Sequence, residues 1–145
     1  MRILAVDPGS KNLGIALSDP TGTIANPLTV LKHVSRHANA AAILEIAEKN
    51  DVQVIVVGQS LDQAAQPTFE GRRAARLAAE IQSLPNEIEV ILWDESFSTI
   101  EAQQARLALG SPRRKRKGHL DDLAATVILQ SYLDAHHEQQ SVGDE

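Results

Sequence analysis

The sequence predicts an α/β fold built on a mixed β-sheet. Two patterns alternate along its 145 residues: short apolar runs rich in β-branched residues, and longer segments whose apolar residues recur with a helical period. Three strand candidates come first with no helix between them, and two more alternate with helices. The first three strands should therefore pair antiparallel through short turns. The later strands should pair in parallel through right-handed crossovers.

The first two strand candidates form a predicted β-hairpin. Residues 3–6 are apolar at every position, as is typical of a strand covered on both faces, and they end at Asp7-Pro8-Gly9. Residues 13–18 form the second apolar run, directly after the turn. The third candidate covers residues 24–31, where Pro27 favours an edge position or an irregular start.

The rest of the chain alternates helices and strands. Residues 52–58 give the strongest buried-strand signal, because they are few and rich in valine and isoleucine. Residues 88–93 make the fifth strand, which like the first ends in an acid. Helical spacing of apolar residues predicts four helices, over 38–50, 68–84, 99–109 and 119–135.

Composition limits the class of protein. No linker, repeat or low-complexity block divides the chain, so we expect one domain over 1–138 and a flexible polar tail over 139–145. The absence of cysteine excludes a disulfide framework and a thiolate metal site. No apolar run approaches the roughly 18 residues of a membrane span, and the N-terminus lacks a signal-peptide layout. These features predict a cytoplasmic protein with no membrane partner.

Charge is distributed unevenly. The net charge is −5, from 14 basic and 19 acidic residues. Five of the basic residues form one run: Arg113, Arg114, Lys115, Arg116 and Lys117. The remaining nine basic residues stand against nineteen acidic ones, a balance of −10. This pattern indicates a local basic patch on an acidic body, either a solvated loop or a site that binds the phosphates of nucleic acid.

Acids follow two of the predicted strands and open the last helix. Asp7 and Asp94-Glu95 end strands, and ligand chemistry in open α/β sheets lies beyond the carboxyl ends of the strands, so these acids can face one crevice. Asp121-Asp122 opens the last helix. The residues that share a helical face with Asp121 are Ala125, Ile128 and Tyr132. We therefore expect Asp121, rather than Asp122, to point inward.

A metal ion would explain the acids together. Three carboxylates repel one another unless a cation lies between them, and oxygen ligands suit Mg²⁺ or Mn²⁺. Two such ions can activate a water and stabilise the leaving oxygen of a phosphodiester. Structural roles remain open for each acid alone: Asp7 as a turn residue, Asp94-Glu95 as a loop or helix cap, and Asp121-Asp122 as complements to the helix dipole.

Four stretches resemble one protein family. They are residues 5–19, with Asp7-Pro8-Gly9 and Gly14-Ile15-Ala16; residues 54–58; residues 94–99; and residues 115–134, with Lys115-Arg116-Lys117, Asp121 and Ala124-Ala125. On these stretches the sequence resembles the YqgF/RuvX family, relatives of the RuvC Holliday junction resolvases. The fourth stretch is the most specific. The first alone also fits sugar-kinase and actin-type ATPases.

The resemblance carries its own expectations. It implies an RNase H-like fold with a five-stranded mixed sheet and flanking helices. It also implies that Asp7, Glu95 and Asp121 are the metal-binding and catalytic acids. Two stretches depart from the family pattern: residues 59–66 replace a proline followed by an asparagine- and glycine-rich loop, and Ser96-Phe97 replaces an arginine and a leucine. The missing arginine removes a phosphate or carboxylate contact.

The leading interpretation is a metal-dependent nuclease acting on structured nucleic acid. The resemblance points to the 5′ end of precursor 16S ribosomal RNA. Lys11 and the run Arg113–Lys117 would hold the nucleic-acid backbone. Junction resolution on branched DNA is an alternative that calls for paired sites and hence a homodimer, so both a monomer and a homodimer stay open. A weakly catalytic RNA-binding factor in ribosome assembly is another, and a phosphotransferase is least favoured because the chain has no Walker-type glycine-rich loop.

Overall fold

The computed structural model describes residues 1–95 and 120–143, and within the last helix it describes the side chains of residues 123–137. Five strands and three helices are present in this part of the chain. In chain order they are β1 (Arg2–Pro8), β2 (Asn12–Ser18), β3 (Ala25–Lys32), α1 (Arg36–Lys49), β4 (Val52–Gln59), α2 (Phe69–Ser83), β5 (Glu89–Asp94) and α4 (Leu120–Gly143).

The strands form one mixed sheet in the order β3-β2-β1-β4-β5. β1 pairs antiparallel with β2, which pairs antiparallel with β3. β4 pairs in parallel with both β1 and β5. The expected α/β fold, with a five-stranded mixed sheet whose first three strands are antiparallel, is therefore confirmed. The sheet order places the ends of β1, β4 and β5 next to one another at one edge, which is where the first and fifth strands end in acids.

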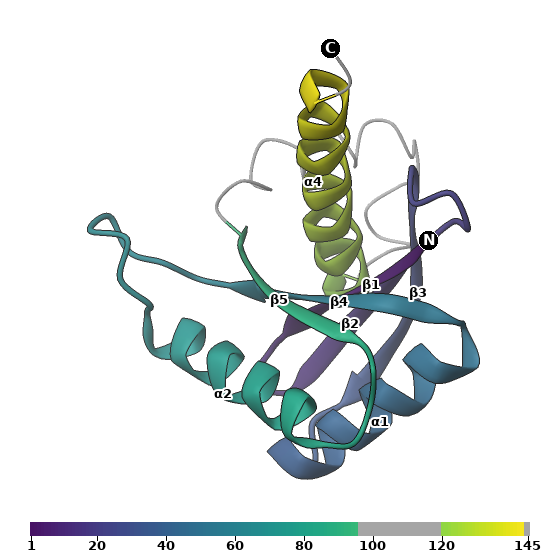
Figure 1. Cartoon of the computed structure of the whole chain (residues 1–145). Coiled ribbons are helices and arrows are strands. Elements are labelled where there is room, and N and C mark those ends of the chain that lie inside the picture. Colours follow the sequence, from purple (N-terminus) through teal and green to yellow (C-terminus); the bar gives the residue numbers. More distant parts are fainter. Residues whose placement is uncertain (96–119, 144–145) are drawn as a thin grey trace.

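Helices cover both faces of the sheet. Figure 1 shows α1 and α2 on one face and α4 on the other. Side chains alternate between the two faces along each strand. In β1, Leu4 and Val6 pack with α1 and α2, whereas Ile3 and Ala5 pack with α4. Two separate apolar cores result, which explains why β1 and β4 are apolar at nearly every position.

Two boundaries differ from the sequence prediction. α1 begins at Arg36, before the expected residue 38, because Ser35 caps it: the Ser35 hydroxyl oxygen accepts a hydrogen bond from the Ala38 amide at 3.1 Å. The prediction that the last helix ends at residue 135 is wrong, since α4 continues to Gly143. The predicted helix over 99–109 lies outside the described residues. Within the described part of the chain, no helix is long and apolar enough to cross a membrane.

We expect Ser35→Ala to lower the free energy of unfolding by about 1 kcal/mol, because the change leaves the Ala38 amide without its capping oxygen. Chemical denaturation measures the loss. Ser83→Ala is the matched control, since the Ser83 hydroxyl lies in the last turn of α2 and bonds only locally, to the Glu80 carbonyl. Equal effects of the two changes would show that Ser35 does not act as a cap.

Candidate active site

A pocket of about 190 Å³ lies at the sheet edge where β1 and β4 end. It is lined by Asp7, Pro8, Gly9, Gly58, Ser60, Glu70 and Glu95. Two of the acids predicted from the sequence, Asp7 and Glu95, therefore lie in one pocket although 88 positions separate them in the chain. The β-strands bring them together: Asp7 is in β1, and Glu95 directly follows β5.

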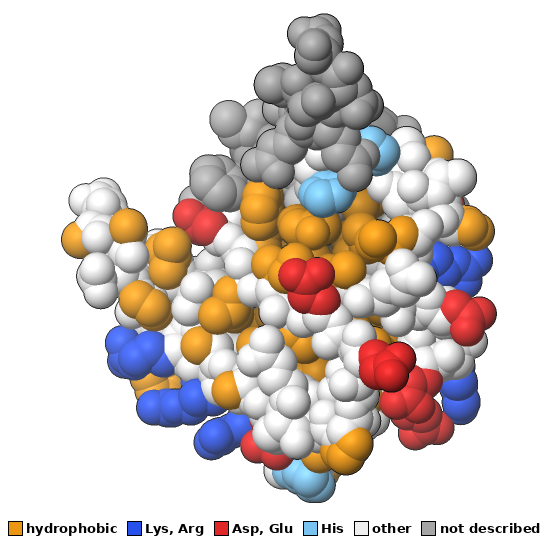
Figure 2. All heavy atoms as spheres, in the orientation of Figure 1, with side chains coloured by type: hydrophobic (Ala, Val, Ile, Leu, Met, Phe, Trp, Pro, Cys, Tyr) orange, Lys and Arg blue, Asp and Glu red, His pale blue; other side chains and the backbone are white. Residues whose placement is uncertain are grey.

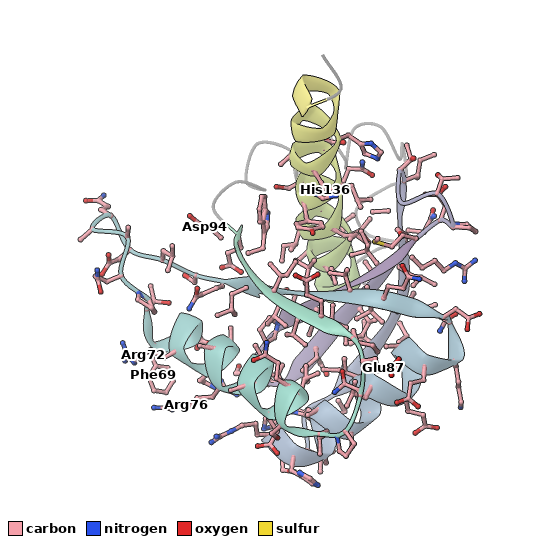
Figure 3. All side chains as sticks on the ribbon, in the orientation of Figure 1. Phe69, Arg72, Arg76, Glu87, Asp94 and His136 are labelled. Atoms are coloured by element: carbon pink, nitrogen blue, oxygen red, sulfur yellow. The ribbon has the colours of Figure 1, made fainter. Side chains whose placement is uncertain are left out.

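The strand period explains the side on which these groups lie. Ile3 and Ala5 face α4, so Asp7 continues that side of β1. Ile91 and Trp93 likewise pack on the α4 side, and Glu95 continues the same series. Figure 3 shows Asp94 at this end of β5 and Glu87 before its other end. Both carboxylates thus lie on the α4 side of the sheet, at the carboxyl ends of their strands.

Gly58, at the end of β4, leaves room for Ile128 of α4 beside the pocket. A Cβ atom at this position would lie 2.7 Å from Ile128 Cδ1 and 3.6 Å from Glu95 Oε2. Glycine therefore lets α4 pack against the end of β4 while the Glu95 carboxylate lies alongside. At Gly58 the apolar core beneath α4 is therefore in contact with the acidic pocket.

The position of Asp121 follows from the course of α4. Ile128 lies at the carboxyl end of β4, whereas the His137 ring nitrogen lies 3.0 Å from the Gly22 carbonyl at the opposite end of the sheet. The first turn of α4, which contains Asp121, therefore lies before Ile128 along the helix, on the side away from Gly22. The side chain of Asp121 lies outside the described residues.

The residues expected to share the face of Asp121 do face the core. Ala125, Ile128 and Tyr132 are all buried against the sheet, as predicted. Thr126 and Gln130 follow Asp122 at helical spacing, on the side expected to be wetter. Gln130 accepts a hydrogen bond from the Ala25 amide at 2.9 Å, but Thr126 is buried. The predicted buried face is confirmed for Ala125, Ile128 and Tyr132, the wetter side is wrong at Thr126, and the inward orientation of Asp121 stays a prediction.

Glu70 lines the acidic pocket but was not predicted from the sequence. It lies in the first turn of α2, which begins after the cap Thr68, whose hydroxyl accepts a hydrogen bond from the Gly71 amide at 3.1 Å. A helix that follows a parallel strand starts at the carboxyl edge of the sheet, so an acid in its first turn lies near the acids that end the strands. The sequence Thr68-Phe69-Glu70, a capping residue followed by an acid in the first turn, indicates this position.

The predicted basic residues do not line this pocket in the described part of the chain. Lys11 is exposed in the turn between β1 and β2. The run Arg113, Arg114, Lys115, Arg116 and Lys117 lies outside the described residues. Their expected contact with nucleic acid stays a prediction.

A model of the RuvX family, described as Holliday junction resolvase, matches residues 1–135. The chain belongs to the RuvX family. A relative from Syntrophus aciditrophicus, named "Putative pre-16S rRNA nuclease", is 37% identical over 144 residues, covering 99% of this chain and 95% of the relative. A relative of the same name from Thermoanaerobacter pseudethanolicus is 37% identical over 136 residues, covering 93% of this chain and 97% of the relative.

Solved structures share the fold of this RuvX-family chain. Thermus thermophilus RuvC in complex with a Holliday junction substrate matches with a TM-score of 0.65 at 16% identity, covering 94% of this chain and 96% of RuvC. Fowlpox virus resolvase in complex with Holliday junction DNA matches with a TM-score of 0.58 at 16% identity, covering 93% of this chain and 98% of the resolvase. The RNase H-like fold expected from the family resemblance is confirmed.

The electrostatics of the RuvX-family pocket disfavour negative charge. Partial burial raises the pKa of Glu95 above its ordinary value, and repulsion from Asp94 and Glu70 raises it further. A positive ion among these groups would relieve both effects. The donor atoms are hard carboxylate oxygens, and Mg²⁺ commonly takes one or two carboxylates and keeps several waters. Asp7 and Glu95 fit that ligand set.

The described residues do not complete a three-acid site. Within the described part of the chain, no three His, Asp or Glu side chains converge closely enough to hold an ion. Asp7 and Glu95 share the pocket, while the third predicted ligand, Asp121, has its side chain outside that part. The metal-binding roles of Asp7, Glu95 and Asp121 stay predictions.

The raised pKa of Glu95 predicts a pH-dependent stability. The folded metal-free protein holds the Glu95 proton more tightly than the unfolded chain does. The contribution of Glu95 to the free energy of unfolding therefore decreases as the pH rises above about 4 and through the pKa of the folded state. Glu95→Gln removes the titration. The unfolding free energy of the wild type, minus that of Glu95→Gln, should therefore fall as pH rises from about 4 toward neutral.

Urea denaturation in EDTA across this pH range makes the measurement. Glu87→Gln is the matched control, because Glu87 is exposed and lies just before β5, at the opposite end of that strand from Glu95. Its difference from the wild type should show less dependence on pH. Parallel stability profiles for the wild type and Glu95→Gln would contradict the electrostatic account.

Proposed function

We propose that the chain is a nuclease that hydrolyses phosphodiester bonds in structured nucleic acid, with the 5′ end of precursor 16S ribosomal RNA as its substrate. The observation that carries the proposal is the meeting of Asp7 and Glu95 in one pocket at the carboxyl edge of the sheet. Family membership and relatives named for this RNA support it. Such a substrate would place the protein in the cytoplasm.

Each acid has a role in the proposal. Asp7 and Glu95 would hold Mg²⁺ or Mn²⁺, and Asp121 would complete the ligand set and position the attacking water. The bound ion would supply Lewis-acid stabilisation of the phosphodiester and an activated water. Lys11 and the run Arg113–Lys117 would hold the backbone phosphates, so that the scissile bond rests on the acidic pocket despite the repulsion of like charges.

A cleavage panel tests the function. The substrates are a precursor 16S fragment with its 5′ extension, an unstructured single strand and a four-way DNA junction, each with Mg²⁺ or Mn²⁺. The proposal predicts metal-dependent cleavage of the precursor fragment by the wild type and a lack of cleavage by Asp7→Asn. The absence of cleavage of every substrate with either ion would reject it.

Junction resolution is the second candidate. It is favoured by the description of the matching family model and by the shared fold of two resolvases in complex with junctions. A resolvase needs paired sites and hence a dimer. Preferred cleavage of the four-way junction, together with a dimer in sedimentation, would select this function. Salt-sensitive RNA binding without cleavage would instead select an RNA-binding role.

A further inference from the structure

A second pocket opens beside the acidic one. It has a volume of about 320 Å³ and lies between α1, α2 and the turn after β1. Pro8 and Gly9 line both pockets, so the two adjoin at this turn. The start of α2 also contributes to both: Glu70 lines the acidic pocket, whereas Phe69 lines the second one. A strand of nucleic acid that crosses the turn would therefore contact both pockets.

The second pocket is basic. Arg36 from α1 and two arginines from α2, Arg73 and Arg76, line it, as does His33. Among its lining residues in the described part of the chain there is no aspartate or glutamate. Arg73 lies 3.7 Å from the carboxylate of Glu70, which lines the acidic pocket, so this guanidinium lies between the two pockets. Because the rest of the protein is acidic, three arginines in one hollow concentrate positive potential there.

An exposed aromatic ring, that of Phe69, lies beside these arginines and lines the second pocket. Phe69 is 63% exposed although it is a large apolar residue at the start of a helix. The Arg72 guanidinium lies 5.9 Å from the centre of its ring. Figure 3 shows Phe69, Arg72 and Arg76 along the outer side of α2, and Figure 2 shows Lys and Arg side chains gathered over this helix. An exposed ring flanked by arginines is the combination on which unpaired bases stack.

We propose that this second pocket binds an unpaired nucleotide segment of the substrate strand, with phosphates on Arg36, Arg73 and Arg76 and a base stacked on Phe69. The inference rests on the proposed nuclease function for the identity of its ligand. The strand would run across Pro8-Gly9 and place the neighbouring phosphodiester over the acidic pocket. Substrates with a single-stranded extension beside the cleavage site are thereby favoured over blunt duplexes.

Binding without cleavage tests the arginines. Fluorescence anisotropy in EDTA compares a short labelled single-stranded RNA with the same strand in a blunt duplex. Arg36→Gln/Arg76→Gln should weaken single-strand binding about tenfold and lower the slope of log K against log salt by roughly 1.4, at about 0.7 per lost phosphate contact. Arg2→Gln/Lys49→Gln removes the same charge from residues that do not line the pocket, and should leave the affinity near that of the wild type.

Substitution of the ring tests stacking. Phe69→Leu should weaken single-strand binding roughly tenfold with little effect on the duplex, whereas Phe69→Trp should retain it. The ring is exposed, so neither change should disturb the fold. The inference would be overturned if the pocket variants bound single-stranded RNA as tightly as the Arg2→Gln/Lys49→Gln control. It would also be overturned if Phe69→Leu weakened binding of the single strand and of the duplex equally.

The design separates this inference from the nuclease proposal. Binding that depends on Arg36, Arg76 and Phe69 in a protein that cleaves no substrate would support the second pocket and reject the nuclease function. Cleavage by a protein whose pocket variants bind like the control would reject the second pocket alone.

Discussion

Asp7→Asn is expected to reduce the cleavage rate at least about 1,000-fold, with no loss of fold. If Asp7 holds the metal ion as proposed, its loss costs several kcal/mol of transition-state stabilisation, and each 1.4 kcal/mol is a factor of ten in rate. Asparagine keeps the size of the side chain at the end of β1, where Asp7 is half-buried opposite Gly14. Single-turnover cleavage of the precursor fragment measures the rate, and thermal unfolding checks the fold.

Asp51→Asn provides the matched control. Asp51 is exposed, lies near the other end of β4 and has a left-handed φ of 55°, which asparagine tolerates. The same loss of charge there should leave cleavage within about twofold of the wild type, because the screened charge lies far from the pocket. Comparable cleavage by Asp7→Asn and Asp51→Asn would show that the activity comes from elsewhere.

Gly71→Ala is expected to lower the free energy of unfolding by about 3 kcal/mol. A Cβ atom at Gly71 would lie 2.1 Å from the Ser60 carbonyl oxygen, a backbone atom that no side-chain rotation can move away. The same carbonyl accepts a hydrogen bond from the Thr68 amide at 3.1 Å, so its position is fixed by the start of α2. Chemical denaturation measures the change.

The sign of this effect makes it a sharp test. Alanine is a better helix former than glycine by about 1 kcal/mol, so propensity alone predicts that Gly71→Ala stabilises α2. Ala79→Gly, at an exposed position of the same helix, measures that propensity difference directly. A stable Gly71→Ala protein would mean that α2 does not approach Ser60 so closely. Since α2 carries Glu70 and Phe69, the positions of these two lining residues, and hence the shapes of both pockets, would then differ from those described.

Much of the fold follows from local pattern. The apolar runs in β1 and β4 predict strands buried on both faces, and the structure packs helices on each face as that pattern requires. The strand-ending acids Asp7 and Glu95 could be placed together because the edge of a parallel sheet collects the ends of its strands. The helical spacing that groups Ala125, Ile128 and Tyr132 correctly gave the buried face of α4.

The rest of the site depends on contacts between distant segments. Glu70 joins the acidic pocket because α2 starts beside Ser60, and the closeness of that approach rests on Gly71. The second pocket likewise combines Arg36 with two arginines of α2, which periodicity within one helix cannot reveal. The continuation of α4 past residue 135 was missed because its polar sequence there shows no apolar stripe.

Crystals of the protein soaked in Mn²⁺ show directly whether Asp7 and Glu95 bind a divalent ion. Anomalous scattering locates the ion without any assumption about activity. We expect a peak in the pocket between the Asp7 and Glu95 carboxylates, and its disappearance in Asp7→Asn crystals under the same soak. Manganese bound only at other positions, with the two carboxylates left uncoordinated at saturating concentration, would rule out the proposed metal site.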